Sequence, residues 1–559
     1  MNRLQNELSP YLLCWAEDGV DWYPWGREPF SRAAEEHKPL LISIGTTPTQ
    51  HTMHRGKGTA ARLTERYFIP VQVDGEEHPE VAAYYAQAGA MLAGRTETPL
   101  SVLADSSGKP FFVSGALREV ELAGLLSGVA LHWNSDAADY EAVAALMGAQ
   151  LCAPQQHGEP SEDVGQIWEM RWRQLQEEYD RENGGFGTGP KSLRTRDLLF
   201  LLAYGKYTGD RLPVDMAADA LRAMALGAVR DQIGGGYFRG TTDARWLQPI
   251  PEKRLVDQAW LLEAYTMAYR ATGDGLFRRV AAEIADFVMR ELRHAAGGFY
   301  TAQWSEHGFY HWTASQVCEI LGSNDGSVFC RQYSVGDEPS VPHLYNGDAP
   351  EEDSVLLHDL RMKLYRARLE RGGIQRDDKV LAGRNGVMIA ALARCGRALG
   401  VERYLSGAYE AERFVRSRLV SDCDLRRYWC HGTAAGDGGL EDFAGYALGL
   451  LELYRSGCGG EYLRHAAKVM TRGDALFSDH SHGGWYLTRC QSHLPARPKQ
   501  QWDDAVPTAW GVGLMVLVGL AREIAYPGLR KRVRELVREA AGSGCCQCGY
   551  GLAAMMDMV

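Results

Sequence analysis

Residues 231–258 read DQIGGGYFRGTTDARWLQPIPEKRLVDQ, a polar segment with helix-like apolar sequence on both sides. Three consecutive glycines, Gly234 to Gly236, allow backbone angles and close approaches that no side chain permits. Charged and aromatic residues follow within a few positions, and a plain surface turn has little use for so many of them. We therefore expect this segment to form the floor of a concave site between two helices.

Two glycines followed by an aromatic residue recur along the chain. The pattern is found at 184–186, 235–237, 297–300 and 483–486, among segments with apolar residues at three- and four-residue steps. This repetition predicts a closed ring of helical hairpins, because an isolated hairpin cannot bury both of its faces. The aromatic rings are then expected to face a shared central funnel or, in the alternative, to plug the end of the ring.

Amphipathic helices are predicted for most of the chain after residue 163. Periodicity places them at 165–179, 197–207, 214–230, 256–272, 277–293, 355–371, 385–399, 404–420, 442–456, 462–477, 508–524 and 529–541. A polar stretch with two prolines, residues 154–162, precedes the first of them and is typical of a domain boundary. We therefore predict one domain over 1–150 and a second, all-α domain over 163–559.

The first domain has a different pattern. Strands are expected at 39–45, 68–73, 100–103 and 110–113, and helices at 60–67 and 79–92. Alternating strands and helices indicate a small α/β domain. Pro99, directly before a strand, fits the thioredoxin arrangement, in which a cis-proline faces the active-site loop.

Composition limits the expected partners. The 559 residues carry a formal net charge of −11, and the sequence pI is about 5.9, so nucleic acid is not an expected partner. No apolar run approaches the ~20 residues that span a bilayer, and the N-terminus lacks the uninterrupted apolar core of a signal peptide. We expect a cytoplasmic protein without membrane contact.

The twelve cysteines are scattered and include no CxxC pair. A disulfide framework is not expected for a chain of this size and spacing. Cys545, Cys546 and Cys548 lie close enough in sequence to hold a metal ion, but no matching second cluster lies nearby. We predict neither a bound metal nor a cofactor.

Several motifs together identify a family. SPYLLCWAEDGVDWYPWG, PLLISIG and VQVDGEEHPEV closely resemble the thioredoxin-like domain of the family that includes spermatogenesis-associated protein 20. GGFGTGPKSL, the 231–258 segment, GFYHWT, RDDKVLAGRNGVMIAALA, LEDFA and GGWYLT resemble its C-terminal region. The resemblance implies a thioredoxin-like domain followed by an (α/α)6 toroid, similar to N-acylglucosamine 2-epimerases and six-hairpin glycosidases.

The thioredoxin-like loop departs from the family pattern. Both family cysteines are replaced, by Thr49 and Thr52. A hydroxyl cannot act as the low-pKa thiolate of disulfide exchange, so no dithiol redox activity is expected at this loop. His51 and His54 stand beside these threonines, either as a metal or acid–base pair or as the polar start of a helix.

The resemblance implies a carbohydrate-like ligand in the toroid funnel, because aromatic faces stack on sugar rings and charged groups bind hydroxyls. The implied catalytic residues are Glu252, Asp257, Asp243 and His311. The implied substrate-binding residues are Tyr237, Arg239, Arg245, Trp246, Lys253, Asp378, Asn385, Glu441 and Asp442.

This region also departs from the family. Phe238 stands where a histidine is expected, Ile250 and Pro251 replace a His-Phe pair, and Gln303 and Trp304 replace an acidic pair. These changes remove groups suited to proton transfer near neutral pH. An alternative is therefore a buried salt-bridge network that holds the loops, built from the ion-pairing and scaffolding residues Asp243 with Arg245 and Glu252 with Lys253, together with the adjacent carboxylates Glu441 and Asp442.

Three functions remain open from the sequence. The first is a toroid that binds or processes a carbohydrate-like molecule, with epimerase-, isomerase- or glycosidase-like chemistry if it is an enzyme. The second is a non-catalytic scaffold or interaction protein. The third is a thiol-redox protein, which Thr49 and Thr52 disfavour.

Overall fold

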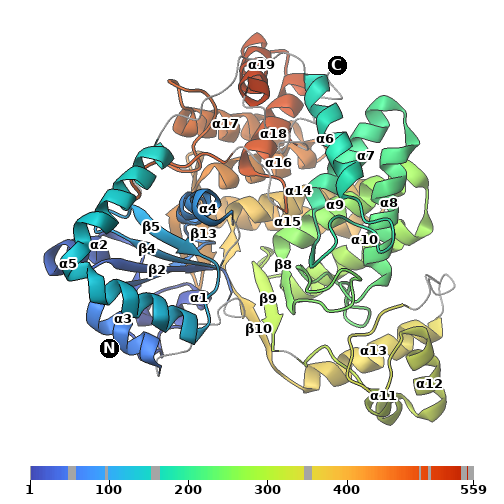
Figure 1. Cartoon of the computed structure of the whole chain (residues 1–559). Coiled ribbons are helices and arrows are strands. Elements are labelled where there is room, and N and C mark those ends of the chain that lie inside the picture. The colour runs from blue at the N-terminus through green and yellow to red at the C-terminus, as the bar shows by residue number, and fades with distance from the viewer. Residues whose placement is uncertain are drawn as a thin grey trace. The chain divides into compact units, whose positions relative to one another are not determined.

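The computed structural model (Figure 1) describes residues 2–47, 58–94, 99–152, 164–306, 308–344, 355–489, 493–500, 505–542 and 551. Its contacts divide the chain into two compact units. The first unit comprises 1–156, 427–439 and 476–500, and the second comprises 157–426, 440–475 and 501–559. The sequence placed 427–439 and 476–500 in the helical region, whereas the contacts assign these two segments to the first unit.

A five-stranded mixed sheet forms the centre of the first unit, with the strand order β1-β3-β2-β4-β5. Strand β2 is parallel to β3 and antiparallel to β4. The strands are β1 (Tyr23–Pro24), β2 (Leu40–Gly45), β3 (Ile69–Asp74), β4 (Leu100–Ala104) and β5 (Pro110–Ser114). The helices are α1 (Pro10–Leu13), α2 (Arg27–Glu36), α3 (Thr59–Tyr67), α4 (Pro79–Ala93) and α5 (Glu119–Cys152), and a 3₁₀ turn covers Arg3–Asn6.

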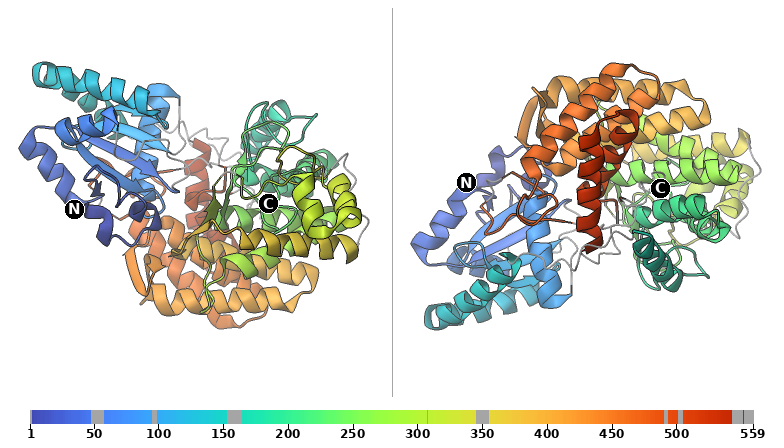
Figure 2. Two further views of the ribbon diagram at one scale, coloured as in Figure 1. Left: turned by 90° about the horizontal axis from the view of Figure 1, so that it is seen from below. Right: turned by 90° about the horizontal axis from the view of Figure 1, so that it is seen from above.

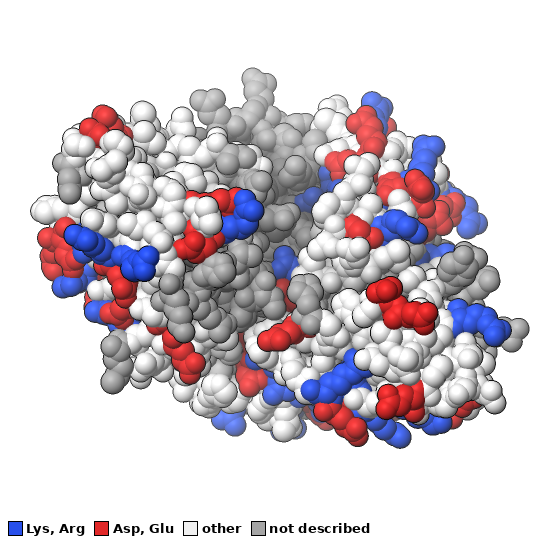
Figure 3. Space-filling view, turned by 60° about the horizontal axis from the view of Figure 1, so that its bottom comes forward, with Lys and Arg blue, Asp and Glu red and all other residues white. Residues whose placement is uncertain are grey.

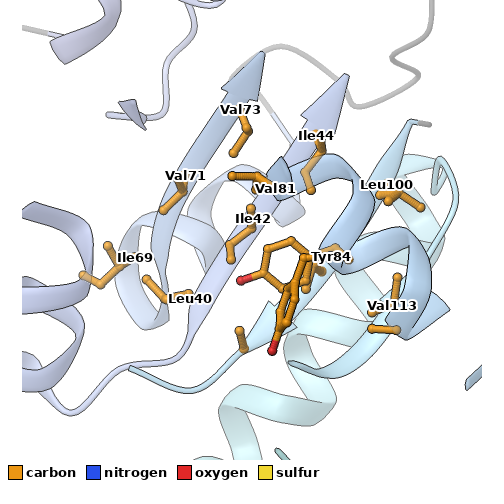
Figure 4. Packing of buried hydrophobic residues seen from close by; sticks show 14 of the residues in the cluster. Leu40, Ile42, Ile44, Ile69, Val71, Val73, Val81, Tyr84, Leu100 and Val113 are labelled. Carbon is orange, nitrogen blue, oxygen red and sulfur yellow. The ribbon is translucent and has the colours of Figure 1, made fainter. Parts of the chain in front are cut away.

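Alternation along the strands gives the sheet two apolar faces. Leu40, Ile42 and Ile44 point to one face, where they pack with α2 and α4 (Figure 4). Leu41 points to the other face, into a second cluster that includes side chains of α3 and α5. Figure 2 shows α3 and α5 together along one side of the sheet. The sheet is thus covered on both faces, as a strand buried on both sides requires.

The second unit is a toroid of helical hairpins, which confirms the predicted fold class. In the described part of the chain its inner helices are α7 (Thr195–Thr208), α9 (Leu255–Thr272), α14 (Ala382–Leu399), α16 (Leu440–Arg455) and α18 (Ala509–Glu523). Its outer helices are α6 (Val164–Glu178), α8 (Arg211–Leu226), α10 (Gly275–Phe287), α15 (Glu402–Leu419), α17 (Gly460–Phe477) and α19 (Pro527–Gly542). The inner helices pack successively on one another, α7 on α9, α9 on α14, α14 on α16 and α16 on α18.

Burial distinguishes the two helix layers. The inner helices α9, α14, α16 and α18 are buried over nearly their whole lengths, since they contact neighbours on all sides. Outer helices such as α10 bury only one apolar stripe. Because each outer helix reverses the chain, the inner helices run parallel and begin at the same end of the ring. All twelve helices predicted from periodicity are present.

The connections hold structure that periodicity did not predict. Helices α11 (Ala314–Leu321) and α12 (Ser323–Gln332) precede α13 (Val355–Glu370), and a π-helical turn, Val288–Leu292, follows α10. Strands β8 (Glu252–Arg254), β9 (Ala302–Ser305) and β10 (Ile374–Asp377) form an antiparallel sheet. The other short strands are β6 (Lys191–Ser192), β7 (Gly240–Thr241), β11 (Val380–Leu381), β12 (Val420–Ser421), β13 (Asp424–Cys430) and β14 (Thr433–Asp437). These strands lie in connections and leave the helical ring intact.

The structure also shows how charge is distributed on the surface and whether any helix could cross a membrane. On the face in Figure 3, acidic (red) and basic (blue) side chains are interspersed over the described part of the surface. No helix among the described residues is long and apolar enough to cross a membrane.

Candidate functional site

The glycine-aromatic loops lead into the N-terminal ends of inner helices. In the 231–258 segment, β7 and β8 run between Gly236 and the start of α9 at Leu255. Gly235 and Gly236 have φ of 79° and 74°, in the left-handed region that favours glycine. A Cβ at Gly234 would lie 2.9 Å from Asp231 Oδ2 and would also collide with the Arg368 guanidinium. The absence of a side chain at Gly234 thus leaves room for a charged cluster beneath the loop.

Three of these loops contain the same aspartate–lysine clamp. In each, a lysine further along the chain donates to the aspartate that opens the loop, with Nζ–Oδ2 distances of 2.7 Å. The same ammonium donates to the carbonyl of the first glycine of the Gly-Gly-aromatic motif. The three sets are Asp180–Lys191–Gly184, Asp231–Lys253–Gly235 and Asp479–Lys499–Gly483. The repetition indicates that the clamp closes the loop, a structural role.

Lys253 is enclosed by aromatic rings. Its Nζ lies 5.0 Å from the ring centre of Phe238, 4.8 Å from that of Phe287 and 5.1 Å from that of Tyr310. Burial lowers the pKa of Lys253 to about 8, although the nearby Asp231 carboxylate favours the charged form. Phe238, which stands where the family resemblance implies histidine, is therefore a wall of a cation cage.

Asp231 is the centre of the buried network, and the list of candidate residues missed it. Arg368 of α13 donates two hydrogen bonds to its carboxylate, at 2.9 and 2.8 Å. Burial alone would raise the pKa of Asp231, but the charges of Arg368 and Lys253 hold it well below its usual range. Arg368 lies 137 residues from Asp231, so no spacing in the sequence could have paired them.

The predicted Glu252–Lys253 pair is wrong. Adjacent residues of a strand point to opposite sides, and β8 directs Lys253 to Asp231 while Glu252 contacts Arg239 at 3.2 Å. Both side chains are buried. The alternative of a salt-bridge network holds for this segment, with different partners from those predicted.

The predicted Asp243–Arg245 ion pair is also replaced. The Asp243 carboxylate accepts backbone N–H groups of Arg245, Leu247 and Gln248 at 2.8–3.2 Å. It therefore shapes its own loop, as aspartate commonly does in turns. Arg245 is exposed.

Trp246 does not present its ring to the funnel. It is buried, has a positive φ of 63° and donates from Nε1 to the Gly184 carbonyl at 3.3 Å. The stacking of this ring on a sugar, which the sequence predicted, would require the indole to leave that site.

Five more candidates hold local structure. The Tyr237 hydroxyl lies 2.7 Å from that of Tyr265. Asn385 binds the backbone N–H and carbonyl of Phe299, at 2.8 and 2.9 Å, and Asp442 accepts from the Gly383 N–H at 3.0 Å. Asp378 accepts from Arg376 Nε at 2.5 Å. Glu441 lies 3.5 Å from Arg384 Nε, in place of the predicted association with Asp442.

The aromatic members of the glycine loops are buried as well. Phe186, Tyr237 and Phe299 are each less than 10% exposed and lie in β-bridges that close their loops. This agrees with the alternative in which the aromatic side chains fill the end of the helical ring and do not face a central funnel. His311 is partly buried, and its carbonyl oxygen accepts from Arg371 Nη1 at 3.0 Å.

A set of partly exposed arginines remains where the inner helices begin. Arg239, Arg254 and Arg384 have side chains 21%, 20% and 15% exposed, and each contacts a carboxylate. The partners are Glu252, Asp257 and Glu441, at 3.2, 2.7 and 3.5 Å. These guanidiniums are held in place and still reach the surface.

The arrangement at α9 recurs at α7. Asp257 lies in the first turn of α9 and pairs with Arg254, three residues earlier. Asp197 lies in the first turn of α7 and pairs with Arg194 at 2.6 Å, also three residues earlier. A carboxylate in the first turn is favoured by the helix dipole, and it orients an arginine at the mouth of the ring.

The remaining predicted groups lie outside the described residues. These are Thr49, His51, Thr52 and His54 in the first unit, and Cys545, Cys546 and Cys548 near the end of the chain.

Comparison with known proteins places the chain in a family. A family model described as a protein of unknown function, DUF255, matches residues 1–151. Spermatogenesis-associated protein 20 of Rattus norvegicus is 30% identical over 601 residues, covering 93% of this chain and 75% of the relative. The mouse protein of the same name is 30% identical over 600 residues, with the same coverage.

Solved structures are similar at greater distance. A D-mannose isomerase is 11% identical with a TM-score of 0.45, covering 67% of this chain and 85% of its own. A GH76 α-mannanase of Bacteroides thetaiotaomicron is 10% identical with a TM-score of 0.45, covering 67% and 83%. The present chain has a thioredoxin-like N-terminal region, a helical toroid and relatives that are 30% identical over most of its length. It therefore belongs to the spermatogenesis-associated protein 20 family.

Proposed function

We propose that the second unit binds a carbohydrate-like small molecule, including acidic and phosphorylated sugars, at the end of the ring where the inner helices begin. One observation carries the proposal: Arg239, Arg254 and Arg384 are each oriented by a carboxylate and keep 15–21% of their side-chain surface exposed. A guanidinium has five N–H donors in a fixed fork that suits hydroxyl, carboxylate and phosphate oxygens.

Preorganisation is the physical reason for choosing these three arginines, of which the sequence predicted only Arg239, over the predicted residues that are buried. The ion pair of Arg239 uses Nη1 towards Glu252, and the carboxylate limits the rotamers that the arginine would otherwise lose on binding. Trp246, Asn385 and Asp442 are bound to backbone groups and buried. They support the loops that carry the arginines.

The proposal is for binding, without an assigned catalytic step. Phe238 packs its ring against Tyr310, with centroids 4.7 Å apart, where the family resemblance implies an imidazole. Glu252 and Asp257 are buried, and each contacts an arginine. In the first unit we propose that Thr49 and Thr52 make no dithiol exchange.

A thermal-shift screen against sugars, sugar acids and sugar phosphates tests the binding proposal. A ligand at ~100 times its Kd stabilises the folded protein by ~2.7 kcal/mol. Arg239→Lys and Arg384→Lys keep the charge that neutralises the partner carboxylate but lose the planar fork. We expect both variants to fold normally and to lose most of the ligand-induced shift.

Arg181→Lys is the matched control, because Arg181 is exposed and outside this set. It should retain the full shift. The absence of any stabilising compound in the library, with a wild-type protein that unfolds cooperatively, would favour the non-catalytic scaffold function instead. A hit whose shift is unchanged in both arginine variants would move the ligand away from these residues.

A further inference from the structure

A cavity lies between the inner helices of the helical unit, at the end where these helices finish. It has a volume of about 490 Å³ and is lined by residues of α7, α9, α14, α16 and α18. The lining residues come from the middle and C-terminal halves of these helices, the opposite end from the glycine-aromatic loops. This volume is in the range of small-molecule sites.

Among the described residues, six cationic side chains and two carboxylates line this cavity. The cationic residues are Lys206, Arg270, Arg394, Arg397, Arg455 and Arg522. The carboxylates are Glu263 and Glu452. The lining therefore has a formal charge of +4 in a chain whose net charge is −11.

Every described inner helix contributes one basic residue from its last turn. These residues are Lys206 of α7, Arg270 of α9, Arg397 of α14, Arg455 of α16 and Arg522 of α18. A basic residue at a helix C-terminus also complements the helix dipole, which would apply equally to the outer helices. Among the outer helices that the structure describes, only α15 has basic residues there, Arg416 and Arg418, whereas α6, α8, α10, α17 and α19 have none. The bias towards the inner layer points to the cavity.

Buried carboxylates hold part of this cationic set in place. Glu452 accepts from Arg394, Arg397 and Arg455 at 3.1, 2.8 and 3.0 Å. Arg394 also reaches Glu263 at 2.9 Å. Even when Glu523, which Arg455 contacts at 3.1 Å, is included, cations exceed carboxylates by three.

The other cations stand at the rim, where Lys206, Arg270 and Arg522 are exposed. No ion pair of Arg270 is found within the described ranges. Apolar side chains form the remaining wall, among them Met267, Leu448 and Met515. The cavity thus joins an apolar wall to a cationic rim.

We propose that this cavity binds an organic anion with an acidic head group on a compact apolar body. The guanidiniums of Arg270 and Arg522 contact the carboxylate or phosphate head, and the apolar wall covers the body. This site is separate from the funnel at the other end of the ring. The two proposals succeed or fail independently.

Isothermal titration of the full-length protein with phenyl phosphate tests the site. Inorganic phosphate presents the head alone and phenol the body alone. We expect phenyl phosphate to bind in the millimolar range or tighter, and at least tenfold more tightly than either part. Its affinity should fall as sodium chloride is raised, because rim charges are screened.

Variants locate the bound anion. Arg270→Ala with Arg522→Ala removes two exposed charges, so the fold should persist while the Kd for phenyl phosphate rises at least tenfold. Met267→Trp should weaken binding without a change in charge, by filling the cavity. Arg173→Ala with Arg181→Ala removes two exposed arginines outside the cavity lining and should leave the Kd unchanged.

Three results would overturn the proposal. They are no heat of binding for phenyl phosphate up to about 10 mM, an unchanged Kd in the Arg270/Arg522 double variant, or loss of binding in Arg239→Lys alone. The last result would place the anion in the funnel.

Discussion

Asp231 joins two cations of different kinds, a lysine inside an aromatic cage and an arginine from α13. Removing one partner of such a buried group leaves an uncompensated charge, which is the costly event in a buried network. Arg245, in the same segment, has an exposed side chain. Substitution of Arg368 and of Arg245 therefore compares the stability contribution of a buried ion pair with that of a surface arginine.

Arg368→Ala should lower the free energy of unfolding by ~3–5 kcal/mol, whereas Arg245→Ala should change it by less than ~0.5 kcal/mol. Guanidinium chloride unfolding of both variants, followed by tryptophan fluorescence, measures the difference. Equal effects would mean that the Asp231 network contributes no more to stability than a surface arginine.

The lowered pKa of Glu452 predicts how the free energy of unfolding depends on acid pH. Burial alone would raise the pKa of Glu452, but Arg394, Arg455 and Arg397 lower it from 4.5 to about 2. A carboxyl whose folded-state pKa is lowered contributes its full stability above the unfolded pKa. That contribution is lost as the pH falls from about 4.5 through about 2.

Glu452→Gln should therefore flatten the pH dependence of stability between pH 5 and pH 2 by about 3 kcal/mol, since one pKa unit corresponds to about 1.4 kcal/mol. Unfolding free energies of wild type and variant at several pH values in this window measure the slope. Parallel curves for the two proteins would contradict the assignment.

At the scale of elements, the Gly-Gly-aromatic loop is a closed unit that packs against the next outer helix. A Cβ at Gly236 would lie 2.6–2.8 Å from the Phe287 ring, whereas a Cβ at Gly273, the C-cap of α9, would meet nothing within 4 Å. Both glycines have φ of 74°. The pair therefore separates backbone strain from a steric clash.

Gly273→Ala should cost ~1–2 kcal/mol, the cost of the left-handed conformation for a residue with a Cβ. Gly236→Ala should cost ~1–3 kcal/mol more, because the methyl group meets a buried ring. Thermal or denaturant unfolding of the two variants gives the difference directly. A smaller decrease in unfolding free energy for Gly236→Ala than for Gly273→Ala would show that α10 moves to accommodate the added methyl group.

At the scale of the whole molecule, a thioredoxin-like unit without its cysteine pair accompanies a helical toroid. The protein should reduce insulin no faster than the background rate with dithiothreitol, because Thr49 and Thr52 cannot form a disulfide. A turbidity assay of insulin, with thioredoxin as the positive control, measures this. Cys14→Ser removes the only cysteine of the N-terminal domain ahead of Cys152, and reduction that persisted in this variant would reveal another active thiol.

The sequence alone determined the main helices, the strands of the first domain and the kind of architecture. All twelve predicted helices, β2 within one residue of its ends, and the change from strand–helix alternation to helical hairpins were confirmed. Period and glycine placement are local properties of the chain, so they can be recognised without knowing what packs against what. Family motifs spread along the sequence carried the rest of this inference.

Only the tertiary structure decided the partners of the charged residues. Asp231 meets Arg368 across 137 residues, and β8 sends the neighbours Glu252 and Lys253 to opposite sides. Five of the six basic residues that line the cavity between the inner helices come from the last turns of five different helices, which the ring brings together at one end. Which charges meet depends on how distant elements pack, and a one-dimensional pattern of residue types does not contain that information.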